Sequence, residues 1–370
     1  MQSLEAEAQA TRRAAASAPA NQKSRRSQGK QPRLATIARS EHGPSVVSSN
    51  EAQPTLFALP PRVIEPAAID AAQRALAAGL SPALRMGTMS WSFPGWRGVV
   101  YANDAEPKLL AEAGLTAYVQ HPLLRSVEVD RSFYDPLPER YFREIAAQVP
   151  EGFRFLVKAH EECTLPRFPK HARYGKRQGE TNPRFLDPAY AEGAVVGQCV
   201  PGLGDKLGVV LFQFPPQDAG DPSEFADRLQ AFLERLPRGV PYAVELRNAE
   251  LFTPAYARAL TAAGALHAHN AWGAMPSVLA QARLIPPAAR KPLIVRWLMR
   301  RGDEYEAARS RFLPFNRLAE PDLPTREEIA TLISKALAHD VPAFVLINNK
   351  AEGCAPFSVA ELARAIAARG

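Results

Sequence analysis

Cysteine is scarce in this chain, which has three among its 370 residues. Cys163, Cys199 and Cys354 lie far apart and form no CxxC pair, so a cysteine-based zinc module is excluded. The lack of a disulfide-like spacing favours a reducing compartment, and we expect a cytoplasmic protein. No apolar run approaches the 18 or so residues that a membrane span requires, so no membrane association is expected.

Common catalytic and nucleotide-binding motifs are also missing. The first predicted strand is followed by neither a G-x-G-x-x-G nor a P-loop sequence, which argues against a doubly wound nucleotide-binding sheet. Ser90 lacks the G-x-S-x-G elbow of a nucleophilic serine. With 46% AVILMFWYC and 22% charged residues, the composition is that of a globular protein, and a wholly disordered or fibrous chain is excluded.

Positive charge is concentrated at the N-terminus. Residues 1–50 carry eight Lys/Arg and three acidic residues, so they account for +5 of the net charge of +7. Residues 1–60 are rich in Ala, Ser, Gln and basic residues, and we expect a disordered basic tail, with a transit peptide or a nucleic-acid-binding arm as alternatives. Residues 61–83 are expected to form a linker or pre-barrel helix, and residues 84–370 the folded domain.

Eight short β-rich runs alternate with helical patterns in the folded domain. The predicted strands are residues 85–90, 125–130, 153–159, 207–213, 241–247, 264–269, 293–298 and 342–348. Helix starts are predicted at Asp221-Pro222, at Thr253-Pro254 and at Thr325, where a capping side chain precedes the apolar periodicity. Eight strands alternating with helices over roughly 290 residues are typical of a (β/α)₈ barrel. We therefore predict an α/β fold, a TIM-type barrel with a disordered N-terminal extension.

Polar residues stand at the carboxyl ends of most of these runs, where barrel enzymes place their active sites. Because alternate strand residues share a face, residues i and i+2 are expected to point the same way. Four such pairs are Glu128/Asp130, Lys158/His160, Glu245/Arg247 and His267/His269, and the other polar ends are Ser90, Gln213, Arg296, Asn348 and Asn349. We predict that they converge on one polar pocket. The alternatives are a structural Glu245–Arg247 ion pair, a simple turn at Asn348-Asn349, and core histidines on the sixth run.

The segment after the third predicted strand, residues 163–190, is long for a loop between a strand and a helix. Its basic residues are Arg167, Lys170, Arg173, Lys176, Arg177 and Arg184, and its aromatic ones include Phe168, Tyr174 and Phe185. Basic residues with interleaved aromatics can hold phosphates or stack on bases. The segment is thus a candidate contact for nucleic acid, and the alternative is a solvated surface excursion.

Five motifs resemble, in order, those of the YecE-like proteins, a bacterial family of unknown function. They are Gly87–Gly98 (GTMSWSFPGWRG), Val127–Tyr134 (VEVDRSFY), Phe153–Lys158 (FRFLVK), Leu207–Pro216 (LGVVLFQFPP) and Ala243–Arg247 (AVELR), followed by Asn348-Asn349. The resemblance spans residues 84–365 and implies a TIM-type barrel without supplying a reaction. The site residues that it carries over are Ser90, Trp91, Glu128, Tyr134, Lys158, Gln213, Glu245, Arg247, Arg296, Asn348 and Asn349.

Two positions depart from the family's pattern. Asp130 stands where the family usually has Asn, which adds a negative charge next to Glu128. After Arg296 the family commonly has a His-Gly pair, whereas this chain continues with Trp297–Gly302. A role for that histidine is therefore not carried over.

The leading functional hypothesis is an uncharacterised enzyme, a hydrolase or isomerase, acting on a phosphorylated or polyhydroxyl substrate such as a sugar or nucleotide. In this hypothesis Glu245 or Glu128 is the base, Lys158 the electrophile or acid, and Arg247 with Arg296 the clamp for an anion. The residues expected to contact the substrate are Ser90, Trp91, Tyr134, Gln213, Asn348 and Asn349.

Two other hypotheses remain open. One is a barrel that depends on a divalent metal and resembles endonucleases or isomerases, with Glu128, Glu245, His160 and His269 as candidate ligands. The other is a protein without catalytic activity that binds an anionic ligand or nucleic acid through the basic tail and residues 163–190.

Overall fold

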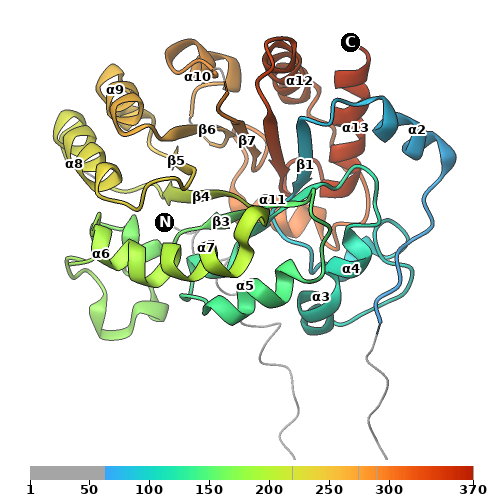
Figure 1. Ribbon diagram of the computed structural model, residues 1–370, viewed down its shortest axis with the longest axis horizontal. Helices are drawn as coiled ribbons and strands as arrows, with labels where there is room; N and C mark the ends of the chain where they lie inside the picture. Colours follow the sequence, from blue (N-terminus) through green and yellow to red (C-terminus); the bar gives the residue numbers. More distant parts are fainter. Residues whose placement is uncertain (1–62, 219, 274, 289, 370) are drawn as a thin grey trace, which may run out of the picture.

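The computed structural model describes residues 63–218, 220–273, 275–288 and 290–369. Eight parallel strands form a closed barrel in chain order, with β8 next to β1 (Figure 1). They are β1 (Leu84–Thr88), β2 (Ser126–Val129), β3 (Arg154–Lys158), β4 (Leu207–Phe214), β5 (Tyr242–Leu246), β6 (Leu266–Ala271), β7 (Leu293–Trp297) and β8 (Ala343–Ile347). The predicted TIM-type barrel is confirmed, and every strand begins and ends within two residues of its predicted bounds.

Helices cover the outside of the barrel. They are α2 (Ala71–Gly79), α3 (Pro107–Ala113), α4 (Leu115–Tyr118), α5 (Glu139–Ala146), α6 (Pro188–Ala191), α7 (Gly197–Leu203), α8 (Pro222–Glu234), α9 (Pro254–Ala263), α10 (Val278–Leu284), α11 (Tyr305–Phe312), α12 (Leu323–Ala338) and α13 (Ala355–Ala367). In Figure 1, α8, α9, α10, α12 and α13 follow one another around one side, while α3, α4, α5 and α7 lie on the other. Within the described parts of the chain, no helix has the length and apolar character needed to cross a membrane.

The N-terminal predictions fall partly outside the structure. The expected tail, residues 1–60, lies outside the described residues, and so do its alternatives as a transit peptide or a nucleic-acid-binding arm. Helix α2 lies within the segment 61–83, where its cap Asp70 accepts a hydrogen bond from the Gln73 backbone N–H at 2.7 Å. It packs beside α13, the C-terminal helix.

Two of the three predicted helix starts are confirmed. Asp221 caps α8 and Thr253 caps α9, each by accepting a hydrogen bond from a backbone N–H in the first turn. The prediction that Thr325 is a cap is wrong, because α12 begins at Leu323 and Thr325 is already in its first turn. The cap is Asp322, whose Oδ1 accepts a hydrogen bond from the Thr325 backbone N–H at 3.3 Å.

The strands are buried on both faces, since side chains fill the barrel and helices cover its outside. The interior is not purely apolar. Lys158, Gln213, Glu245 and Arg296 are each at most 1% exposed. Charged groups at this depth are costly unless they are paired, so their partners determine what this end of the barrel can do.

Gly87 is the point of close approach between β1 and β2. A Cβ atom at this position would lie 1.8 Å from the Ser126 carbonyl oxygen of the paired strand. We expect Gly87→Ala to lower the free energy of unfolding by about 2 kcal/mol, a usual cost of overpacking a core. Gly152→Ala is the matched control, because a Cβ there meets nothing within 4 Å. Equal urea midpoints for the two variants would contradict this explanation.

Candidate functional site

A cavity of about 1250 Å³ opens at the carboxyl ends of the strands. Its walls come from the carboxyl ends of β1, β2, β7 and β8, from the segments that follow these strands and β3, and from helices α3 and α5. The predicted site residues on these walls are Ser90, Trp91, Glu128, Tyr134, Arg296, Asn348 and Asn349. The predicted residues Lys158, Gln213, Glu245 and Arg247 lie outside the walls and are buried. The polar residues at the strand ends therefore form two layers. One layer faces the cavity, and the other is buried beneath it.

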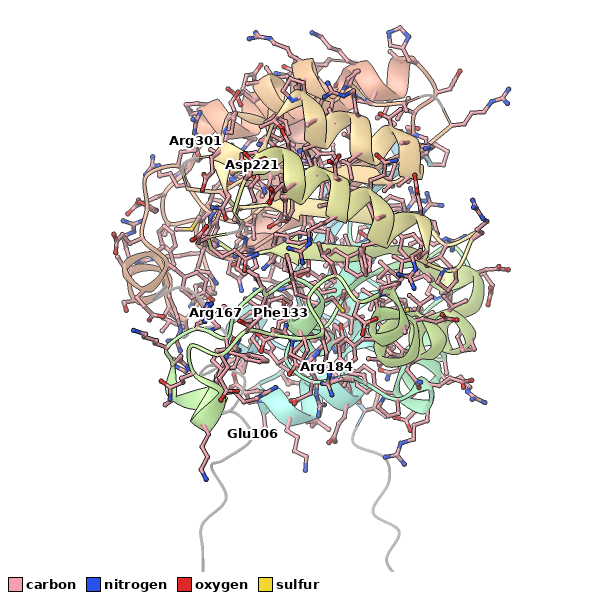
Figure 2. The ribbon with its side chains drawn as sticks, turned by 90° about the vertical axis from the view of Figure 1, so that its left-hand side faces the viewer. Glu106, Phe133, Arg167, Arg184, Asp221 and Arg301 are labelled. Carbon is pink, nitrogen blue, oxygen red and sulfur yellow. The ribbon has the colours of Figure 1, made fainter. Side chains whose placement is uncertain are left out.

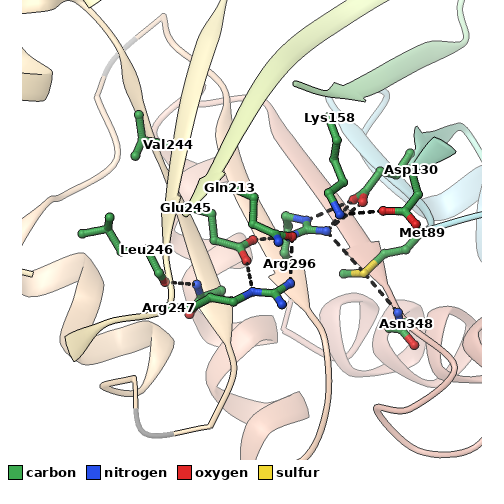
Figure 3. Close-up of polar contacts among 12 residues, drawn as sticks. Met89, Asp130, Lys158, Gln213, Val244, Glu245, Leu246, Arg247, Arg296 and Asn348 are labelled. Atoms are coloured by element: carbon green, nitrogen blue, oxygen red, sulfur yellow. Dashed lines mark hydrogen bonds and ion pairs between the residues drawn. The ribbon is translucent and has the colours of Figure 1, made fainter. Parts of the chain in front are cut away.

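Arg296 on β7 is the centre of the polar cluster (Figure 3). Its Nε donates to Glu128 Oε2 at 3.0 Å, and its Nη2 lies 2.8 Å from both Glu128 oxygens. Its Nη1 donates to Glu245 and, at 3.2 Å, to Gln213 Oε1, while Nη2 also lies 3.7 Å from Met89 Sδ. Four of the five guanidinium N–H donors are directed at carboxylate or amide oxygens of the protein, and the fifth faces only the weak acceptor Met89 Sδ. This arrangement does not support the predicted role of Arg296 in clamping an anion.

Arg247 extends the cluster beneath the cavity. Its Nε donates to Glu245 Oε1 at 2.9 Å and its Nη2 to Gln213 Oε1 at 2.8 Å. The guanidinium lies 4.1 Å from the centroid of a ring of Trp272, which covers it. Burial alone would raise the pKa of Glu245, but the charges of Arg296 and Arg247 outweigh that effect and hold the pKa below its usual range. The geometry therefore fits the alternative of a structural Glu245–Arg247 ion pair better than a catalytic base and an anion clamp.

Glu128 differs from Glu245 because it lies on the cavity wall. Burial raises the pKa of Glu128 to about 7, against the opposing charges of Arg296 and Lys158 and with the help of the negative charge of Asp130. A carboxyl group that titrates near neutral pH can both take up and release a proton, which is the requirement for general acid–base catalysis. Of the two predicted bases, Glu128 lies on the cavity wall and has a raised pKa, although both of its oxygens accept hydrogen bonds from Arg296.

Lys158 is turned away from the cavity. Its Nζ donates to Asp130 Oδ1 at 2.6 Å and lies 4.0 Å from the centroid of the Phe133 ring. The Lys158 side chain is 1% exposed, whereas the Asp130 side chain is 27% exposed and lines the cavity. The prediction of Lys158 as an electrophile is therefore not supported by this geometry. What the lysine does is hold Asp130, the residue that departs from the family's pattern, at the cavity surface.

The histidines of β6 do not reach the cavity. His267 Nδ1 lies 3.0 Å from the hydroxyl of Tyr256 on α9, and its Nε2 lies 3.0 Å from Gln281 Oε1 on α10. His269 Nε2 lies 3.1 Å from the Ile285 carbonyl oxygen, and burial lowers its pKa to about 4. The alternative of core histidines is confirmed, and the expected convergence of this pair on the pocket is wrong. The odd-numbered side chains of β6 face the helices.

The four candidate metal ligands are likewise not gathered at one point. Glu128 and Glu245 both accept hydrogen bonds from Arg296, and His269 lies in the core. His160 lines the cavity, with its Nδ1 2.7 Å from the Tyr190 hydroxyl. Among the residues that the structure describes, no three His, Cys, Asp or Glu side chains form a group that could hold a metal ion.

The segment 163–190 borders the cavity, and three of its four arginines pair with glutamates, while Arg167 bonds to the Gly179 carbonyl oxygen. Arg177 Nη1 lies 2.6 Å from Glu162 Oε1 and Arg184 Nη1 lies 2.7 Å from Glu162 Oε2, while Arg173 pairs with Glu161. Figure 2 shows Arg184 on this side of the molecule, below Phe133. These two glutamates were not among the predicted site residues, although they lie just beyond the third predicted strand, after His160. Because they offset the arginines, the segment is less basic than its composition suggests.

Arg131 is a cation on the cavity wall that the sequence analysis also missed. It follows β2 directly, within the VEVDRSFY motif. Its guanidinium lies 5.8 Å from the centroid of the Tyr141 ring and forms no ion pair with any described residue. The signal that could have identified Arg131 is its position directly after Asp130, a predicted polar residue at a strand end.

Comparison with known proteins places the chain in a family. The family described as "Protein of unknown function DUF72" matches residues 85–370. The UPF0759 protein YunF of Bacillus subtilis is 31% identical over 152 residues, which cover 40% of this chain and 48% of that protein, about half its length. A DUF72 family protein from Thermotoga maritima superimposes with a TM-score of 0.55 at 19% identity, covering 76% of this chain and 98% of that one.

A second DUF72 family structure, from Enterococcus faecalis, gives a TM-score of 0.54 at 18% identity, with 76% of this chain and 95% of that chain covered. At these identities the structural likeness shows the fold, which agrees with the closed eight-stranded barrel. Because the family match spans nearly all of the barrel, this chain belongs to the DUF72 family of proteins of unknown function.

Proposed function

We propose that this protein is an enzyme that transfers protons during hydrolysis or isomerisation of a phosphorylated or polyhydroxyl substrate, with Glu128 as the general acid–base group. One observation carries the proposal. Glu128 is 1% exposed, lies on the wall of the large cavity and has a pKa raised by burial to about 7. A buried carboxyl group poised near neutral pH is more common at functional sites than elsewhere in proteins.

Asp130 supports this role by supplying a second carboxylate two residues further on. Glu128 accepts hydrogen bonds from Arg296 in the interior, whereas Asp130 is held by Lys158 at the cavity surface. Two carboxyl groups in different environments can serve different functions at one site. In this proposal Glu128 exchanges the proton and Asp130 contacts a hydroxyl group of the substrate.

Arg131 supports an anionic substrate. It is a cation on the same wall as Glu128 and Asp130, and it pairs with no acidic group in the described parts of the chain. In this proposal Arg131, rather than Arg247 or Arg296, contributes positive charge at the cavity for a substrate anion. Contact with nucleic acid through residues 163–190 is supported less, because Arg173, Arg177 and Arg184 pair with glutamates of the protein.

We also propose a finer family assignment and a domain organisation. The five ordered motifs support placing the chain among the YecE-like proteins within DUF72. A basic tail (1–60), a linker with α2 (61–83) and a catalytic barrel (84–370) are the proposed units. The widely spaced cysteines, all three free and buried, favour the cytoplasm as the proposed location.

The test is a screen of sugar phosphates, nucleotides and unphosphorylated sugars by thermal shift, followed by turnover of each stabilising compound. Turnover is followed by phosphate release and by proton NMR, so that hydrolysis and isomerisation are both detected. We expect Glu128→Gln to lower kcat about 100-fold or more, the usual contribution of a general acid–base group. Glu234→Gln on the outer helix α8 is the control and retains full turnover. Full turnover by the Glu128 variant, or no turnover of any compound by the wild type, would overturn the proposal.

A further inference from the structure

Two side chains on the cavity wall formed by the segments after β1 and β8 carry N–H donors for which the described residues supply no acceptor. Trp91 is 5% exposed and Asn349 is 2% exposed, and both line the cavity. The Nε1 of Trp91 and the Nδ2 of Asn349 are themselves buried, and neither has a hydrogen-bond partner among the described residues. Buried polar groups are normally paired, so two unpaired donors on one cavity wall indicate a place for an acceptor supplied by a ligand.

The orientation of the Asn349 amide follows from its other contacts. Its Oδ1 accepts a hydrogen bond from Trp96 Nε1 at 3.1 Å and another from the Ala355 backbone N–H at 2.8 Å. Since both of these partners can only donate, the atom that receives them is the oxygen. The remaining atom of the amide is therefore a donor.

Asn348 adds a third donor to this wall. Its Oδ1 accepts a hydrogen bond from the Lys350 backbone N–H at 3.0 Å, and its Nδ2 lies 3.5 Å from Met89 Sδ, a weak acceptor. Figure 3 shows Asn348 and Met89 next to Arg296. The two segments start side by side because Thr88 of β1 pairs with Ile347 of β8. The donors after each strand are thus at the same part of the barrel mouth.

Helix α13 begins at this wall. Its first residue, Ala355, lines the cavity, and the helix is 13 residues long with no acidic residue in its first turn. The Ala355 N–H is bonded to Asn349 Oδ1 and Pro356 has no N–H, so the helix contributes through its dipole. The N-terminus of a helix carries a partial positive charge that favours anions. Lys350, which is 8% exposed, lines the cavity between Asn349 and this helix. Lys350 Nζ lies 4.2 Å from the centroid of the Tyr305 ring, so its charge stays near this wall. The helix start and Lys350 are both positive, which favours an anion over a neutral hydroxyl or carbonyl group at this part of the cavity.

We propose that Trp91, Asn348, Asn349 and the start of α13 form an oxyanion subsite that binds the phosphate group of the substrate. The inference rests on the proposed function for the identity of the ligand, and it selects the phosphorylated class over the unphosphorylated polyhydroxyl class. In this arrangement the three side-chain N–H groups donate to phosphate oxygens. Glu128 lies on the wall of the same cavity and remains available to the reacting part of the molecule.

Inorganic phosphate is the probe, titrated into the full chain and followed by isothermal titration calorimetry and phosphorus NMR. Saturable binding by the wild type is expected. Asn349→Asp retains an oxygen that can accept from Trp96 and Ala355 but replaces the donor by a charged oxygen, and we expect its Kd to rise at least 10-fold. Trp91→Phe removes only the indole N–H and part of the ring, and we expect a rise of about 3-fold to 10-fold in Kd.

Trp297→Phe is the matched control. Trp297 is 0% exposed, and its Nε1 also has no partner in the part of the chain that the structure describes. It lies outside the cavity walls, so the Kd of this variant is expected to equal that of the wild type. Circular dichroism checks that each variant is folded, and Trp91→Phe decides if Asn349→Asp does not fold. No saturable binding, or the same Kd in all variants, would overturn the subsite. Phosphate binding needs no turnover, so full activity of Glu128→Gln alongside intact phosphate binding would remove the proposed function and leave the subsite standing.

Discussion

Replacing Arg296 by methionine is expected to lower the free energy of unfolding by about 4 kcal/mol at pH 8. The guanidinium is the partner shared by Glu128 and Glu245, which are 1% and 0% exposed. Without it, Glu128 has no cation bonded to it and Glu245 retains only Arg247. Removing one partner of a buried ion pair is much more costly than replacing the whole pair by apolar groups, because the remaining charge stays desolvated. Urea unfolding of the wild type and the variant measures the difference.

Two further variants make this prediction specific. Arg97→Met removes an exposed pair, in which the Arg97 and Asp104 side chains are 61% and 77% exposed, and its effect is expected to stay below about 1 kcal/mol. Arg296→Met combined with Glu128→Gln and Glu245→Gln should recover part of the lost stability, because the uncompensated charges are then absent. A cost for Arg296→Met as small as that of Arg97→Met would show that Arg296 is not what balances the buried carboxylates.

The free energy of unfolding of the wild type is expected to fall by about 3 kcal/mol relative to Glu128→Gln between pH 4.5 and pH 8. Burial raises the pKa of Glu128 from 4.5 to about 7 in the folded protein. In this window the native state keeps a proton that the unfolded chain has released. Protonation therefore favours the folded state at low pH, and this contribution is lost as the pH rises through 7. Urea midpoints across the pH range, for the wild type and the variant, check the prediction.

Glu245→Gln is the contrasting control for this pH dependence. The pKa of Glu245 is held below its usual range by Arg296 and Arg247 in spite of burial, so both the native and the unfolded state are ionised above pH 6. The stability difference between the wild type and Glu245→Gln should therefore be constant from pH 6 to pH 8. If the Glu128 difference were equally constant, Glu128 would be a permanently ionised structural group and its proposed role in proton transfer would fail.

Much of the barrel could be predicted from local sequence because its strands are parallel and covered on both sides. Such strands are continuous apolar runs, and β7 and β8 are buried at every position. Polar residues at the ends of these runs are conspicuous for the same reason. Glu128 and Arg296 could therefore be selected as site residues without knowledge of their partners. Thr325 was misplaced as a cap because both Asp322 and Thr325 are suitable capping residues and only the backbone shows which one precedes the first turn.

The alternation of side chains along a strand shows which residues share a face, but not whether that face is inside the barrel. With both faces buried, burial gives no further guidance, and this is why both histidines were expected at the pocket. His267 instead contacts α9 and α10, and His269 contacts the Ile285 carbonyl oxygen just after α10. The same limit applies to Lys158, whose ammonium group holds Asp130 and does not line the cavity.

The amino-acid sequence alone was sufficient for the eight strands, the family motifs and the end of the barrel at which polar groups gather, because these depend on local pattern. Partner choice depended on the closed barrel, which brings Arg296 to Glu128, 168 positions away, and to Glu245, 51 positions away. Because of such contacts, the charges of Glu245 and Arg247 are balanced beneath the cavity. Glu128, Asp130 and Arg131 lie on its wall. The physical reason is that a buried charge is tolerated only with a partner in space, and closure of the barrel determines which residue that partner is.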